Sequence, residues 1–153
     1  MKWKNGIGGA WRGLLAALVF LGYHGFGVEW EPDKAYERLV KADVFAFGGV
    51  GFAGTTSDGE RAFHVVLAST NGLEVFKKVL KNGTREAQMY ALCGLRKLAS
   101  KEVQAEAERI GSEKATVKMM TGCLIFEEPV SKVVERIRSG AYDGDVKRGQ
   151  NRL

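Results

Sequence analysis

The sequence is poor in the residues that build metal centres and most catalytic sites. Among its 153 residues are two cysteines and two histidines, and of the two histidines only His64 lies beyond residue 27. The chain has no C-x-x-C, H-E-x-x-H or G-x-S-x-G motif, so it offers neither a zinc ligand set nor the usual nucleophile arrangements. We therefore expect no metal, no cofactor and no enzymatic activity.

A long apolar run and a strong charge of one sign are also missing. The net charge is +5, from 23 basic and 18 acidic side chains. Three of the basic ones, Lys2, Lys4 and Arg12, lie in the first 27 residues, which hold no acid; residues 28–153 therefore carry 20 against 18. A domain so close to neutral has no large electrostatic attraction to nucleic acid, and we expect no nucleic-acid partner.

The amino-terminal segment has the three parts of a secretory signal. A positive start precedes the apolar run Gly13–Gly22, and the small residues Gly25 and Gly27 follow before Val28. The apolar run is shorter than the roughly 20 residues of a membrane-spanning helix. Residues 1–27 are thus predicted to be a signal peptide, and the protein to be exported to the periplasm or secreted. The alternative is an uncleaved membrane anchor formed by residues 13–27.

Helix signals recur after residue 28, and strand signals are scarce. Pro32 suits a first helical position, Ser57 followed by Glu60 forms a capping box, and Thr84 can cap the helix TREAQMYALCGLRKL. Further helices are predicted after Thr70, from Ser100 to Ile110, over 113–126 and after Pro129. The expected fold is all-α: antiparallel helical hairpins over residues 28–142, interrupted by one Gly-rich loop, with a flexible basic tail at 143–153.

An internal repeat and a family resemblance both involve the helix that starts at Thr84. REAQMYALCGL aligns with ATVKMMTGCLI at an offset of 30 residues. The basic residue, two alanines and two leucines of this helix resemble the packing face of short HEAT-like repeats found in phycobilin-lyase relatives; here they are Arg85, Ala87, Ala91, Leu95 and Leu98. The layout is also similar to small exported bacterial proteins of unassigned function. The resemblance implies a stacked helical array with a surface for partners, and no particular chemistry.

The Gly-rich loop over residues 48–60 has three interpretations. Gly49, Gly51 and Gly54 spell G-x-G-x-x-G, but the best helix cap comes three residues after the third glycine and no second strand is predicted, which argues against a dinucleotide site. The second interpretation is a structural loop. The third is a loop that binds a small anion or a peptide carboxylate with its amides, hydroxyls and helix start. The residues proposed for such binding are Gly51, Gly54, Thr55, Thr56, Ser57, Asp58, Glu60 and His64.

Two pairs of side chains are candidates for further chemistry. Cys93 and Cys123 are predicted to face each other from neighbouring helices and to form a disulfide in an oxidising compartment, with two buried free thiols as the alternative. His64 follows Glu60 by four residues, so the two share a helix face. A surface or half-buried pair is expected there, because no third group completes a metal or catalytic set.

Together these observations predict an exported, non-enzymatic helical-repeat domain that binds a protein or peptide through the Gly-rich loop. The alternatives are a small-ligand-binding protein or enzyme that uses loop 48–60 with His64, and a membrane-anchored envelope structural protein. The near-neutral charge of the domain and the lack of a heptad seam favour a monomer.

Overall fold

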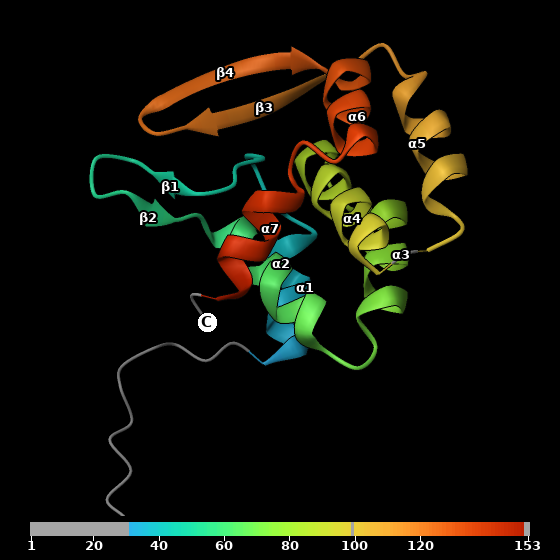
Figure 1. Ribbon diagram of the computed structural model, residues 1–153, viewed down its shortest axis with the longest axis horizontal. Helices are drawn as coiled ribbons and strands as arrows, with labels where there is room; N and C mark the ends of the chain where they lie inside the picture. The colour runs from blue at the N-terminus through green and yellow to red at the C-terminus, as the bar shows by residue number, and fades with distance from the viewer. Residues whose placement is uncertain (1–30, 99, 152–153) are drawn as a thin grey trace, which may run out of the picture.

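The computed structural model describes residues 31–98 and 100–151, and within them the chain is mainly helical (Figure 1). The predicted signal segment, residues 1–27, lies outside these residues. In chain order the helices are α1 (Pro32–Leu39), α2 (Asp58–Ala68), α3 (Gly72–Asn82), α4 (Arg85–Lys97), α5 (Val103–Gly111), α6 (Val130–Ser139) and α7 (Asp143–Gln150). None of them has the length and apolar content needed to span a bilayer. Neighbours in sequence, such as α1 with α2 and α3 with α4, pack side by side.

The helix starts follow from local sequence signals, with one difference. Thr84 Oγ1 accepts from the amide of Ala87 at 3.2 Å, and Ser57 Oγ accepts from the amide of Glu60 at 3.1 Å. These contacts confirm both predicted caps. The other bond of the predicted capping box, from the amide of Ser57 to the Glu60 carboxylate, was wrong. That carboxylate instead accepts from the amide of Gly48 at 2.9 Å. That bond fastens the segment before the first strand to the start of α2.

Two β-hairpins distinguish the fold from the all-α class. Strands β1 (Gly49–Val50) and β2 (Thr55–Thr56) pair antiparallel, and so do β3 (Thr116–Thr121) and β4 (Leu124–Pro129). The β1–β2 turn needs glycine, since Gly51 and Gly54 have φ of +69° and +60°. The amide of Gly51 donates to the carbonyl of Gly122 at 2.8 Å and joins the two hairpins. Figure 1 shows both hairpins on the same side of the helices, with β3–β4 extending away from them.

The prediction of a helix over residues 113–126 was wrong, because residues 116–126 form β3, a turn and the first part of β4. In β3, Val117 and Met119 are buried while Thr116 and Lys118 are exposed, which is the alternation of a strand. The dense apolar residues masked that period of two, and Gly122, with φ of +55°, makes the turn. The internal repeat therefore aligns a helix, α4, with a hairpin, and it is not a repeat of structure.

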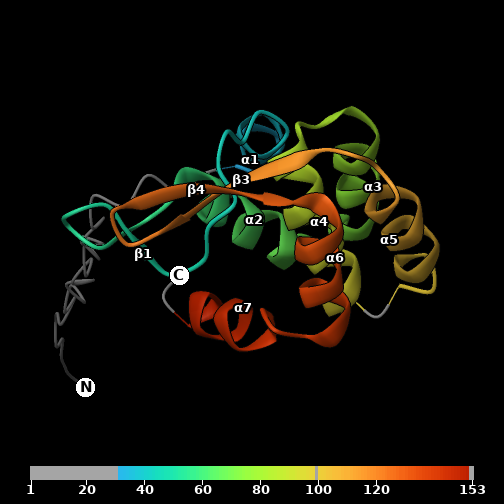
Figure 2. The same ribbon diagram turned by 90° about the horizontal axis from the view of Figure 1, so that it is seen from above.

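The flexible tail predicted for residues 143–153 was also wrong over most of its length, because residues 143–150 form α7. Val146 and Gly149 are buried, and the Arg96 guanidinium donates to both carboxylate oxygens of Asp143 at 2.9–3.3 Å. Figure 2 shows α7 lying along one side of the helical body. The helix carries a single buried apolar side chain, so its composition resembled that of a solvated end.

The core is centred on aromatic rings contributed by segments far apart in sequence. Phe45 and Phe47 from the segment before β1 make edge contacts with Tyr90 of α4, at centroid distances of 4.8 and 5.3 Å. Phe63 of α2 packs on Phe47, and Tyr142, which precedes α7, packs on both phenylalanines. These rings bring the root of β1 against α2, α4 and the start of α7.

Candidate functional site

The residues predicted to form a binding loop separate into a surface group and a buried group. Gly51 and Gly54 lie in the β1–β2 turn, Thr55 and Thr56 form β2, and Asp58 is exposed at the start of α2. The buried group consists of Ser57, Glu60 and His64. The structure thus divides the predicted set between a hairpin tip and the core beneath it.

Three backbone amides of the glycines in the loop already have acceptors within the protein. The amide of Gly48 donates to Glu60, that of Gly51 to the carbonyl of Gly122, and that of Gly54 to the carbonyl of Gly51. An anion site needs such donors to point at the ligand. The geometry of residues 48–60 therefore matches the structural-loop interpretation better than the anion-binding one.

The dinucleotide interpretation finds no matching geometry either. Two parallel bridges connect the segment before and within β1 to the second hairpin, Phe45 with Met119 and Val50 with Gly122. Gly54, however, leads into β2, which runs antiparallel to β1, and α2 begins only at Asp58. A phosphate cradle needs the third glycine at the start of a helix, and here that position belongs to a hairpin turn.

A buried hydrogen-bond cluster around Tyr90 holds the root of the β1–β2 hairpin. The Tyr90 hydroxyl donates to the carbonyl of Ala46 at 2.6 Å, accepts from the amide of Ala46 at 2.9 Å, and lies 3.3 Å from Ser57 Oγ. Burial raises the pKa of the Tyr90 phenol well above its usual range, so the hydroxyl keeps its proton and its donor role. No local pattern marks this role of Tyr90, because its partners Ala46 and Ser57 lie 44 and 33 residues away in the sequence.

Glu60 and His64 do share a helix face, but as a buried pair rather than a surface one. Their exposed fractions are 0% and 2%, and His64 Nε2 lies 3.8 Å from Glu60 Oε1. Within the described part of the chain, that carboxylate oxygen and both imidazole nitrogens have no hydrogen-bond partner. No group of three or more potential metal ligands occurs there either.

Helix α7 closes the space above this pair. A Cβ atom placed on Gly149 would come within 1.9 Å of His64 Nε2, so only glycine lets α7 lie directly on the imidazole. On the neighbouring side, a Cβ on Gly59 would meet the Tyr90 ring at 2.8 Å. The Glu60–His64 pair is therefore enclosed by protein, and no substrate reaches it while α7 is in place.

The two cysteines are free and lie in different environments. Cys93 is buried in α4, and burial raises the pKa of its thiol. Cys123 is exposed in the β3–β4 turn. The predicted disulfide is absent because it required a helix where the second hairpin stands, and the expected facing pair of helices does not form.

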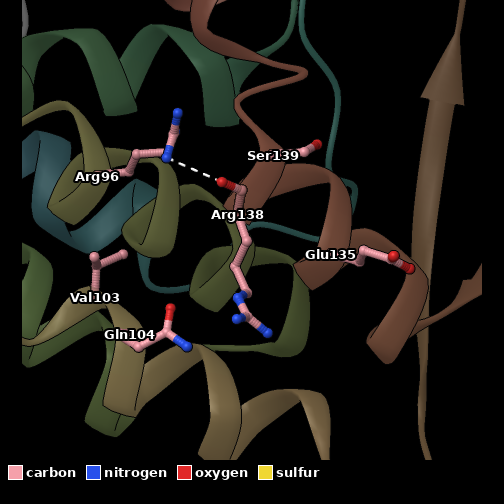
Figure 3. A pocket seen from close by; sticks show the side chains of 6 residues that line it. All are labelled: Arg96, Val103, Gln104, Glu135, Arg138 and Ser139. Carbon is pink, nitrogen blue, oxygen red and sulfur yellow. Dashed lines mark hydrogen bonds between the residues drawn. The ribbon is translucent and has the colours of Figure 1, made fainter.

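The described surface hollows are open and already engaged by the protein's own side chains. One, of about 440 Å³, is lined by residues of α4, α5 and α6 (Figure 3). Its Arg96 donates to the carbonyl of Arg138 at 3.0 Å and also holds Asp143. A second, of about 420 Å³, contains the ion pair of Lys77 with Glu102, at 3.0 Å. Neither hollow is an apolar pocket with convergent polar groups, the usual form of a small-molecule site.

The most distinctive surface is apolar and lies on the two hairpins. Phe52, in the β1–β2 turn, is fully exposed, and Leu124, Ile125 and Phe126 of β4 are 72%, 64% and 40% exposed. We call these four residues the hairpin surface. The sequence-based expectation did not include this surface, because it places Leu124, Ile125 and Phe126 in a helix over residues 113–126. A signal was present, since Phe52 stands between two turn glycines and LIF follows Gly122.

Comparisons of the chain with protein-family models, with curated proteins and with solved structures find no match.

Proposed function

We propose that this chain is an exported, non-enzymatic module that binds protein partners, and that it does so with the hairpin surface. The binding role agrees with the sequence-based expectation, but the surface differs from the amides and helix ends of loop 48–60. The observation that carries the proposal is the placement of exposed apolar side chains. Of the five large hydrophobic residues exposed in the described part of the chain, four belong to the hairpin surface; the fifth is Leu98.

Clustering of this kind points to interaction rather than to chance exposure. Single exposed apolar residues are common on soluble proteins, whereas several of them gathered on one protruding element are typical of an interaction site. The bond from the Gly51 amide to the Gly122 carbonyl ties the two turns together, so the four side chains are presented by one connected structure. A preorganised surface loses less conformational entropy on binding.

The stability of the hairpin root also supports a binding role. Tyr90, Ser57 and Glu60 hold the segment before β1 from beneath, with hydrogen bonds at 2.6–3.3 Å. These polar residues are thus occupied with positioning the hairpins. Exporting the module would bring the hairpin surface to partners outside the cytoplasm, and the signal-like residues 1–27 support that part of the proposal. Mass spectrometry of the amino terminus of natively expressed protein tests it: a terminus at Met1 or Lys2 would contradict cleavage.

Site-specific photo-cross-linking in the native compartment tests the binding role. Benzoylphenylalanine replaces Phe52 or Leu124 in two variants, and Lys78 in a control, because Lys78 is exposed on α3 away from both hairpins. We expect a discrete protein adduct from the two hairpin positions and none from Lys78. Excess unlabelled wild-type protein should suppress the adducts from both hairpin positions. Equal adducts from Lys78, or no adduct from either hairpin position, would refute the proposal.

A further inference from the structure

One edge of the second hairpin is unpaired, and the hydrogen-bond pattern identifies its groups. On β3, the carbonyl of Lys118 accepts from the amide of Phe45 at 2.8 Å, and the amide of Met120 donates to the carbonyl of Phe45 at 3.2 Å. Residues of an antiparallel strand alternate between the two neighbouring strands. Lys118 and Met120 pair in register with Glu127 and Ile125. The backbone groups of Ile125 and Glu127 must therefore point out of the hairpin, at the free edge of β4.

The first half of this edge lacks the usual protection against pairing. Natural edge strands are blunted by lysine, proline, bulges or a covering element. Residues 124–126 contain no charged side chain and no proline; the protective residues Glu127, Glu128 and Pro129 stand only in the second half of the strand. Figure 1 shows β4 on the outer side of its hairpin with no element of the described chain beyond it. Its first three residues are the exposed apolar ones of the hairpin surface.

We infer that a second copy of this chain pairs with that edge, β4 against β4 and antiparallel, about a two-fold axis at Ile125. The inference rests on the proposed function and names the partner for the β4 part of the hairpin surface. The two sheets would join into one sheet of four strands, in the isologous arrangement typical of homodimers.

Charge and apolar matching select this register. Residues whose backbone groups point out of the hairpin must face one another across the new edge. Three pairings between the two copies are therefore possible: Ile125 opposite Ile125, Ile125 opposite Glu127, or Glu127 opposite Glu127. The last brings like charges together, which destabilises a strand pair. The pairing of Ile125 with Glu127 places Leu124 opposite Glu128. In the first, Leu124 lies opposite Phe126 and Glu127 opposite the uncharged Cys123, so apolar side chains meet and acids stay apart.

The position of the axis also leaves room for both molecules. Ile125 is the second residue of β4, next to the turn, and the hairpin extends away from the helices (Figure 1). A two-fold axis near the tip sends the two helical bodies in opposite directions. Contact is then limited to the hairpins, which is small for a dimer interface. We expect dissociation constants of roughly 1–100 µM rather than an obligate dimer.

Cysteine cross-linking distinguishes the three registers. In a C123S background, single variants I125C, F126C and E127C each place a cysteine opposite its own copy in one register only. The Cα separations of facing strand residues, about 4.5–5.5 Å, allow a disulfide. We expect rapid covalent dimers from I125C under mild oxidation, and none from F126C, E127C or a K78C control. Faster cross-linking at position 126 or 127 than at 125 would refute the register.

Sedimentation of the full-length chain tests the dimer without cross-linking. The wild type should change from monomer to dimer between about 1 and 500 µM. Proline at position 125 removes an amide that points outward and leaves the β3–β4 ladder bonds in place, so I125P should weaken association at least tenfold while I125V keeps it. A wild type that stays monomeric at 500 µM overturns the inference. A monomer that cross-links to another protein from position 52 would leave the proposed function standing; a monomer whose hairpin positions cross-link to nothing would overturn both.

Discussion

Substituting Gly149 by alanine tests whether α7 packs on the core as a helix with a defined orientation. The added methyl group would approach His64 Nε2 to 1.9 Å, and the imidazole is 2% exposed, so it has little room to move. Alanine in place of a helical glycine gains about 1 kcal/mol of helix propensity, whereas overpacking costs about 1–3 kcal/mol. The close approach places this site at the upper end of that range, so we expect G149A to lose about 1–2 kcal/mol of unfolding free energy.

Gly144 supplies a matched control in the same helix. A Cβ there meets only the Arg148 guanidinium, at 3.8 Å, which is an ordinary contact. G144A should therefore gain up to about 1 kcal/mol from propensity alone. Urea unfolding followed by circular dichroism measures both variants. The double variant G149A/H64A should recover part of the loss relative to the two single variants. If G149A is as stable as G144A, α7 does not lie on His64 and the packing described above is wrong.

The remaining predictions concern the buried Tyr90 cluster and the two thiols. Y90F leaves the amide and carbonyl of Ala46 without their buried partner, so we expect a loss of about 2–4 kcal/mol in urea unfolding, against less than about 0.5 kcal/mol for the control Y36F; equal losses would refute the cluster's role. Because burial raises the pKa of Tyr90 in the folded state, its contribution is complete below the unfolded value of about 10 and is lost as the pH rises above it. Alkaline unfolding should accordingly depend more weakly on pH above 10 in Y90F. Under native conditions Ellman's reagent should modify one thiol, Cys123, and reach Cys93 only after unfolding; two fast thiols, or none, would contradict the described burial.

Features encoded by neighbouring residues could be predicted from the sequence. The caps at Ser57 and Thr84 act over three residues, and the buried apolar residues of the helices that follow them, α2 and α4, recur at helical spacing. The end of α3 at Asn82 before Gly83 is equally local. Each of these signals places a polar group or a glycine within one turn of its partner, so no knowledge of the fold is needed to interpret it.

Features that depend on distant partners could not be predicted in this way. The carboxylate of Glu60 bonds to Gly48, twelve residues earlier, although a local partner is available in the capping box. β3 contains so many apolar residues that its alternation is visible only once the burial of Val117 and Met119 is known. Helix α7 is stabilised by Asp143 with Arg96 and by a glycine that fits His64, and neither contact leaves a periodic pattern.

The same separation explains why the sequence draws attention to loop 48–60, whereas the surface proposed from the structure uses other atoms. The glycines of loop 48–60 do mark a special backbone, but their positive φ values serve a hairpin turn, and their amides are bonded within the protein. Two polar residues of the predicted set, Ser57 and Glu60, instead hold that turn from below, Ser57 together with Tyr90. The large apolar side chains left exposed are Phe52 at the tip of the first hairpin and Leu124, Ile125 and Phe126 at the start of β4. These side chains are the ones through which we propose that the protein contacts its partners.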